Sequence, residues 1–357
     1  MLDFNPGKKK VILSIDGGGM RGIIAVAMLA ELEKMTGKKV QDLFDMVAGT
    51  STGAIIAAGI ALGMSAQELL DVVYKDRLPK AFGNQGILLW IRYLLTGLRY
   101  LYSLEPFRVA LQPLSRGLKI RDIQHPIILL TTKDVRNGNT YYIVNKGPGA
   151  PAFEDFPLSG AVAASGAAPI FFPPVADNLI DGGVGIDFNP CLAAAVEAME
   201  YIGAAEGFVD GNVILVSLGT GYVPNQFPDG AARKFWLRNW VEYIIVEGLD
   251  DASLGQATST RAIYRRRLDF RRYNPALTRE SITNALGIQL PAGVDPKKLS
   301  LDSRKPEEIA LMEQIGRVYA QKLDWNKAEV MPWDTIGGHT QPSVEKYPVD
   351  WSKTPYR

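Results

Sequence analysis

The N-terminal part of the chain repeats one pattern twice: a short apolar run, a glycine-containing turn and an apolar helix. Residues 11–15 form a β-rich run that ends close to three glycines, and residues 21–35 have helical spacing. Residues 44–48 then predict a second strand, and residues 52–62 an Ala- and Ile-rich helix suited to burial. Strands that alternate with helices form parallel sheets. The pattern therefore predicts an α/β fold, a three-layer α/β/α arrangement with a mainly parallel central sheet.

The remainder of the chain extends this pattern and then changes in character. Further strands are expected at 127–132, 141–145 and 213–218, and further helices at 190–201, 231–260 and 305–323. We expect residues 8–222 to form the core, with an apolar and basic helical insertion at about 75–118. Residues 223–335 predict an extra helical and strand-containing C-terminal part packed on that core, and residues 336–357 an extended tail.

Composition narrows the class of protein. Hydrophobic residues make up 47% of the chain and charged residues 22%, which excludes a disordered, fibrous or polytopic membrane protein. The net charge of +1 provides no bulk attraction to nucleic acid. The single cysteine, Cys191, can form neither an intramolecular disulfide nor a zinc site. Without a signal peptide or an apolar run long enough to span a membrane, we expect a cytoplasmic protein.

The first turn, residues 17–22, matches G-x-G-x-x-G between a strand and a helix, a spacing typical of dinucleotide-binding folds. Such folds need an acidic residue at the end of the second strand to hold the ribose. Here that strand runs into residues 49–53, and Asp45 lies near its beginning. In either interpretation, converging glycine amides and a helix N-terminus favour an anion, which is either a phosphate or a transient oxyanion.

The second turn, residues 49–53, reads G-x-S-x-G between a strand and a helix, the context of a nucleophile elbow. Gly49 and Gly53 relieve steric conflict on either side of Ser51, and the helix directs its positive end at Ser51. The alternative interpretation is a serine or threonine that caps the helix. The pattern favours Ser51 as a nucleophile supported by the two glycines.

A serine nucleophile needs a base, and the chain contains only two histidines, His125 and His339. His339 lies in a polar tail and His125 precedes a proline at a strand start, so surface or packing roles are favoured for both. Asp181 follows an apolar pair and precedes Gly182 and Gly183, which let it approach other backbone closely. A carboxylate acts as a base when burial raises its proton affinity. The alternative for an Asp-Gly pair is a simple turn.

Together these blocks resemble the patatin-like phospholipases. The resemblance is carried by residues 16–22, 49–53 and 181–183, with a further Ala-Ser-x-Ala-x-Pro segment at 164–169 and Leu-Gly-Thr-Gly at 218–221. It covers about residues 10–222. The family often has Asn-Asn-Pro after its Asp-Gly-Gly block, whereas this chain has Phe188-Asn189-Pro190, a departure that bears on local packing.

The resemblance implies a Ser–Asp dyad in which Ser51 attacks the substrate and Asp181 takes its proton. It implies a structural role for Arg21, which holds the glycine-rich loop, with electrostatic help to the oxyanion as the alternative. The implied oxyanion hole consists of the backbone N–H groups of Gly17, Gly18 and Gly19. The implied reaction is acyl transfer from a lipid ester through an acyl-enzyme, without metal or cofactor.

Residues 86–104 are dense in Leu, Trp and Tyr, and Arg92 and Arg99 fall on one helical face. Basic residues between Lys75 and Lys80 precede this segment. The pattern fits a basic amphipathic helix on an anionic membrane surface, or a lid over an acyl-chain pocket. A core helix whose arginines reach outward to water is the alternative.

Arginines are concentrated at residues 261–272, where Asp269 is the one acidic residue. A solvated strand paired with acids elsewhere is the favoured interpretation, and binding of a phospholipid headgroup or nucleotide phosphate is the alternative. Some bacterial proteins that the chain resembles are antiviral effectors activated by cyclic nucleotides. The resemblance therefore also implies a small nucleotide activator as an open alternative.

These inferences combine into one expected function. We expect a serine acyl hydrolase of the phospholipase A type that acts on membrane phospholipids, as a peripheral protein at the inner face of the membrane and without a nucleic-acid partner. The alternatives are a lysophospholipase or neutral-lipid esterase, a nucleotide-activated effector that degrades membranes, and a non-catalytic nucleotide-binding module. No sequence feature specifies an oligomeric state.

Overall fold

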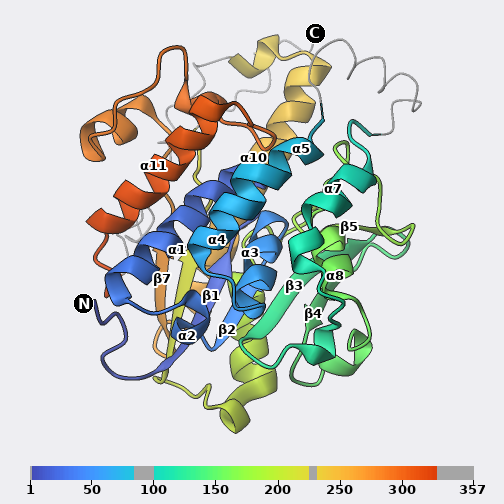
Figure 1. Cartoon of the computed structure of the whole chain (residues 1–357), viewed down its shortest axis with the longest axis vertical. Helices are drawn as coiled ribbons and strands as arrows, with labels where there is room; N and C mark the ends of the chain where they lie inside the picture. Colours follow the sequence, from blue (N-terminus) through green and yellow to red (C-terminus); the bar gives the residue numbers. More distant parts are fainter. Residues whose placement is uncertain (1, 84–99, 225–230, 328–357) are drawn as a thin grey trace, which may run out of the picture.

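The computed structural model describes residues 2–83, 100–224 and 231–327, and its strands form one sheet (Figure 1). The strand order is β4-β3-β2-β1-β6-β7, and the neighbours from β3 to β7 run parallel. Both β4 and β5 pair with β3 in the antiparallel direction. The strands are β1 (Lys10–Ile15), β2 (Met46–Gly49), β3 (Ile127–Asp134), β4 (Thr140–Val144), β5 (Leu179–Asp181), β6 (Val213–Leu218) and β7 (Asp269–Tyr273). The mainly parallel sheet predicted from the alternating pattern is confirmed.

Helices connect and flank these strands. The α-helices are α1 (Gly22–Thr36), α2 (Val40–Leu43), α3 (Thr52–Ala61), α4 (Ala66–Glu68), α5 (Leu78–Ala81), α7 (Leu104–Ala110), α8 (Leu158–Ser165), α9 (Cys191–Val196), α10 (Leu237–Ile263) and α11 (Pro306–Lys322). The π-helices η2 (Leu69–Arg77) and η6 (Glu197–Ile202) continue α4 and α9, and short 3₁₀ turns include η1 (Gly19–Arg21) and η8 (Ala231–Lys234). The last predicted C-terminal helix agrees closely with α11, whereas α10 begins six residues later than the pattern at 231–260 predicts, because η8 comes first.

Two predictions cannot be compared with the structure. Residues 84–99, which carry most of the amphipathic segment 86–104, lie outside the described residues, and so does the predicted tail at 336–357. Among the helices that the structure does describe, none combines the length and apolar character needed to cross a bilayer.

Two hydrophobic cores, one on each face of the sheet, create the three layers. Along β1 the side chains of Val11, Leu13 and Ile15 join one core, and that of Ile12 joins the other, as expected for a strand buried on both faces. α1, α3, α8 and α11 cover the first core, while α9, η6 and α10 cover the second. The α/β/α arrangement is therefore confirmed, with helical elements of the C-terminal part covering both faces.

The position of β5 is the feature of the sheet that matters most for the site. The first half of β3, from Ile127 to Leu130, pairs with β2, and its last residues, from Thr132 to Asp134, pair with β5. β4 pairs with β3 along the side that faces away from β2. β5 therefore lies on the same side of β3 as β2, in line with it, and runs in the opposite direction. The C-terminal ends of β2 and β5 therefore meet head to head alongside β3.

The arginine-rich segment is partly buried, which corrects the expectation of a solvated strand. Arg271 and Arg272 lie on β7 and are 5% and 3% exposed. Arg272 donates hydrogen bonds of 2.6 Å to both carboxylate oxygens of Asp16 and also contacts the hydroxyls of Ser217 and Ser253. Because Asp16 directly follows β1, this pair fixes the place where the chain leaves the sheet. The more exposed members of the segment are Arg261, Arg265 and Arg266.

We predict that Arg272→Gln lowers the free energy of unfolding by about 3–5 kcal/mol, because it leaves the Asp16 carboxylate buried without its counter-charge. Arg267→Gln is the matched control. Arg267 pairs with Glu200 and Asp210 on the surface, and the loss of such exposed pairs costs at most about 1 kcal/mol. Urea unfolding of the three proteins measures both effects. Equal stability of the two variants would contradict the role assigned to the buried pair.

Candidate active site

Ser51 occupies a sharp turn between β2 and α3. Its backbone has φ 56° and ψ −118°, a region that non-glycine residues rarely adopt. A Cβ atom on Gly49 would lie 2.2 Å from the carbonyl oxygen of Gly53, and one on Gly53 would lie 2.3 Å from the oxygen of Ile15. The turn is thus closed only because both positions lack side chains, and it has the geometry expected of a nucleophile elbow.

The surroundings of Ser51 hold the turn from two sides. Its N–H group donates a 2.9 Å hydrogen bond to the hydroxyl of Ser165, at the end of α8. The next residue, Thr52, contacts the buried hydroxyl of Tyr74 at 2.6 Å, and Tyr74 also donates to the Thr52 carbonyl. The role of Ser165 does not follow from the sequence alone. Its signal was the Ala-Ser-x-Ala-x-Pro block, whereas nothing in the sequence pointed to Tyr74.

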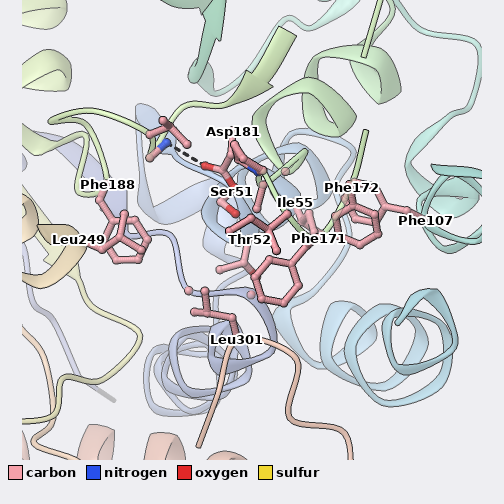
Figure 2. A pocket seen from close by; sticks show the side chains of 18 of the residues that line it. Ser51, Thr52, Ile55, Phe107, Phe171, Phe172, Asp181, Phe188, Leu249 and Leu301 are labelled. Atoms are coloured by element: carbon pink, nitrogen blue, oxygen red, sulfur yellow. Dashed lines mark hydrogen bonds between the residues drawn. The ribbon is translucent and has the colours of Figure 1, made fainter. Parts of the chain in front are cut away.

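Asp181 lies at the end of β5 and faces Ser51 (Figure 2). The carboxylate accepts a 2.8 Å hydrogen bond from the N–H of Gly183, and the nearby hydroxyl of Ser51 acts with it to lower the pKa of Asp181. Burial outweighs both of these influences and raises the pKa of Asp181 to about 6. The head-to-head arrangement of β2 and β5 therefore brings together the serine and the carboxylate that the sequence selected, in an environment where the carboxylate can accept a proton.

Residues 17–19, here called the glycine loop, follow Asp16 after β1 and end at the first residue of η1. The N–H of Gly17 donates to the carbonyl of Phe188 at 2.8 Å, so it is already engaged, which corrects the expectation that three amides serve an oxyanion. Gly18 and Gly19 line the same cavity as Ser51. Their φ angles are 152° and 55°, and any Cβ would collide with Thr220 or with the Leu301 backbone. The structure thus leaves Gly18 and Gly19 as the candidate donors.

Arg21 is 6% exposed and is not among the residues that line the cavity. Burial lowers the pKa of Arg21, and the nearby carboxylates of Asp250 and Asp16 oppose this shift. Among the described residues, its Nε atom has no hydrogen-bond partner. The side chain is therefore buried close to two acids, one that precedes the glycine loop and one on α10.

Gly182 and Gly183 allow the segment after Asp181 to pack against its neighbours. A Cβ on Gly182 would lie 2.1 Å from the hydroxyl of Thr131, and one on Gly183 would lie 2.9 Å from the ring of Phe188. That ring also fills the space beside Gly17, where a Cβ would lie 2.5 Å away. Phe188 therefore packs between the segment that follows Asp181 and the start of the glycine loop.

A cavity of about 460 Å³ opens onto the pair of Ser51 and Asp181. Its walls are mostly apolar, and Figure 2 shows aromatic and aliphatic side chains on both sides of Ser51. Size and lining are typical of a site for an apolar ligand with a few fixed polar groups. The apolar lining residues include Ile55, Leu78, Phe82, Phe107, Phe171, Phe172, Leu249 and Leu301.

Other candidate groups lie elsewhere or outside the described residues. His125 precedes β3 and contacts the carbonyl of Gln41 at 2.8 Å, at the end of the parallel sheet opposite to Ser51. Asp45 is likewise at that end, paired with Lys10 at 2.8 Å, and His339 is not described. Across residues 2–83, 100–224 and 231–327, no three His, Cys, Asp or Glu side chains are grouped to hold a metal ion.

Comparison with known proteins finds relatives over the part of the chain that carries this site. An intracellular phospholipase A2 of Caenorhabditis elegans is 30% identical over 237 residues, which are 61% of this chain and 20% of that protein. A cGAMP-activated phospholipase of Escherichia coli is 27% identical over 241 residues, which are 63% of this chain and 66% of that protein. The chain thus spans one fifth of the length of the first relative and just under two thirds of the second.

Among solved structures, human GIVD cytosolic phospholipase A2 aligns with 88% of this chain and 58% of its own, with a TM-score of 0.41 and 12% identity. The sequence model of the family described as patatin-like phospholipase matches residues 13–195. This match covers just over half of the chain and includes the glycine loop, Ser51 and Asp181. The chain belongs to the patatin-like phospholipase family.

Proposed function

We propose that this chain is a serine acyl hydrolase that releases fatty acids from membrane phospholipids. The observation that carries the proposal is the placement of Ser51, Asp181 and the amides of Gly18 and Gly19 on one apolar cavity. The residues 8–222 form the proposed catalytic core. Membership of the family and the phospholipase relatives support the choice of substrate.

The proposed reaction has two halves. In the first, Asp181 takes the proton of the Ser51 hydroxyl while the oxygen attacks the ester carbonyl, and the charge on the tetrahedral intermediate develops near the amides of Gly18 and Gly19. The C–O bond to the glycerol then breaks, the proton passes from Asp181 to the leaving alkoxide, and the acyl group remains on Ser51. In the second half, Asp181 activates water, which releases the fatty acid and restores the hydroxyl.

The nucleotide-activated effector is the second candidate function. It is favoured by the similarity to a protein named for activation by cGAMP. Fatty-acid release from phosphatidylglycerol vesicles, measured with and without cGAMP, distinguishes the two. Turnover without the nucleotide supports a constitutive hydrolase, and turnover only in its presence supports the effector. The same assay with lysophospholipid and triglyceride substrates tests the lysophospholipase and neutral-lipid esterase alternatives.

We predict that a fluorophosphonate probe labels Ser51, and that Ser51→Ala abolishes labelling and lowers ester hydrolysis by at least about 10³-fold. Mass spectrometry of the labelled protein locates the adduct. Ser115→Ala is the control, because Ser115 is not among the residues of the cavity and its replacement should leave both readouts unchanged. Labelling of a different serine, or activity in Ser51→Ala, would remove Ser51 from the proposed role.

We predict that kcat/KM for a soluble ester rises with pH and is half-maximal near pH 6, because Asp181 must be ionised to act as a base and its pKa is raised to about 6. Below that pH the rate should fall about tenfold per unit. A variant with both His125→Gln and His339→Gln should keep this inflection. If the inflection disappears in the double variant while the fold is intact, a histidine rather than Asp181 is the base.

We also predict that Asp181→Asn is inactive but more stable than the original protein at pH 8. The pKa of Asp181 rises from 3.8, the ordinary value of an aspartate in the unfolded chain, to about 6 in the fold. The stability that the protonated form provides is therefore complete below pH 3.8 and lost as the pH rises through 6. Asparagine avoids this loss, by up to about 3 kcal/mol at pH 8. Urea unfolding at pH 8 and pH 4.5 measures the gain, which should shrink at the lower pH.

A further inference from the structure

We propose that the start of α10, together with the rim of the cavity, docks onto an anionic lipid bilayer. This inference rests on the proposed function, because it identifies how a lipid ester reaches Ser51. This proposed surface, the α10 docking surface, consists of basic and aromatic residues near the start of α10 and apolar residues at the rim of the cavity. They are Arg233, Lys234, Trp236 and Trp240, and Ile170, Val184 and Ile186. The surface combines exposed aromatic, aliphatic and basic side chains beside the mouth of the catalytic cavity.

The aromatic side chains at the start of α10 are unusually exposed. Trp236 is 81% exposed and Trp240 is 40% exposed. The rings of Phe235, Trp240 and Tyr243 form one cluster, in which the centroids of Phe235 and Trp240 are 5.1 Å apart and those of Trp240 and Tyr243 are 6.1 Å apart. Large aromatic side chains gathered on a surface mark a place where another apolar phase or molecule binds. Tryptophan prefers the headgroup level of a bilayer, where its apolar ring and N–H group are both accommodated.

The topology places this cluster at the end of the molecule where the catalytic cavity opens. β7 runs parallel to β6 and follows α10. α10 therefore ends close to where the parallel strands begin. Its own start lies towards the C-terminal ends of these strands, where Ser51 and the glycine loop also lie. Figure 1 shows the start of α10 at the top of the molecule. Gly248 and Leu249 of the same helix line the cavity, and Tyr243 precedes Leu249 by six residues, or about 9 Å of helix.

Further apolar residues at the cavity are exposed. Ile170 and Val184 line the cavity and are 44% and 37% exposed, and Ile186 nearby is 64% exposed. An acyl chain that leaves a bilayer would therefore contact exposed apolar side chains before it reaches Ser51. Continuity between the exposed surface and the apolar cavity favours a bilayer over a second protein as the occupant.

The charges at this surface indicate which bilayer it fits. Arg233 and Lys234 are exposed and directly precede the aromatic residues. The whole chain has a net charge of only +1, so attraction to anionic headgroups must come from a local group of this kind. Basic residues beside interfacial aromatic residues are typical of surfaces that bind anionic leaflets. The proposed occupant is therefore a bilayer that contains anionic phospholipid.

Binding is tested separately from turnover. In a Ser51→Ala background, which prevents hydrolysis, sedimentation with phosphatidylcholine vesicles containing phosphatidylglycerol measures partitioning. We expect Trp236→Ala with Trp240→Ala to lower the partition coefficient at least tenfold, and Arg233→Gln with Lys234→Gln to remove its dependence on phosphatidylglycerol. Tyr201→Ala is the matched control, because Tyr201 is an aromatic residue 60% exposed on η6, towards the opposite end of the molecule, and should leave partitioning unchanged.

Two further measurements keep this proposal distinct from the proposed function. In the active protein, the double tryptophan variant should hydrolyse a soluble short-chain ester at the original rate and vesicle phospholipid at least tenfold more slowly. Quenching of tryptophan fluorescence by brominated phospholipid should decrease in the same variant.

Unchanged vesicle partitioning in the double tryptophan variant would overturn the proposal. It would also be overturned if the original protein is a dimer that this variant converts to monomers while vesicle binding persists, since the surface would then join two copies. Absence of any ester hydrolysis by the original protein would count against the proposed function alone, because partitioning of the Ser51→Ala protein does not depend on turnover.

Discussion

The close approach of two backbone segments, the end of β1 and the first turn of α3, is the constraint on which the active site depends. A Cβ atom on Gly53 would lie only 2.3 Å from the carbonyl oxygen of Ile15. The absence of a side chain at Gly53 lets the start of α3 pack directly against the end of β1. Ser51 and the glycine loop therefore face one cavity. A side chain at Gly53 would separate the helix from the strand, and the serine from the amides of Gly18 and Gly19.

The second constraint is electrostatic. Asp181 is 5% exposed and faces Ser51 from the end of β5, which runs in the direction opposite to β2. The described residues place no cation in an ion pair with Asp181, so burial makes this carboxylate a better proton acceptor and at the same time an unfavourable charge to hold in the folded state. Asp16, in contrast, is buried with Arg272 as its partner. The fold thus compensates the carboxylate that fixes the glycine loop and leaves uncompensated the one proposed to exchange protons.

The sequence predicted those parts of the fold that depend on local patterns. Alternating apolar runs and glycine turns gave the parallel sheet, and the G-x-S-x-G and Asp-Gly-Gly blocks selected Ser51 and Asp181. It did not predict that the N–H of Gly17 would donate a hydrogen bond to the carbonyl of Phe188, or that Arg272 would be buried in an ion pair with Asp16. These contacts join residues far apart in the chain, and a charged run looks the same from its sequence whether its partner is water or a distant acid.

The glycines of the elbow also limit how this protein can change over generations. Any mutation that replaces a glycine with another amino acid adds at least a Cβ atom. At Gly49 and Gly53 that atom would collide with backbone atoms rather than with a side chain that can move. No intermediate residue offers a partial solution. We therefore expect descendants of this gene to keep both glycines or to persist as inactive copies, with few forms of intermediate activity between them.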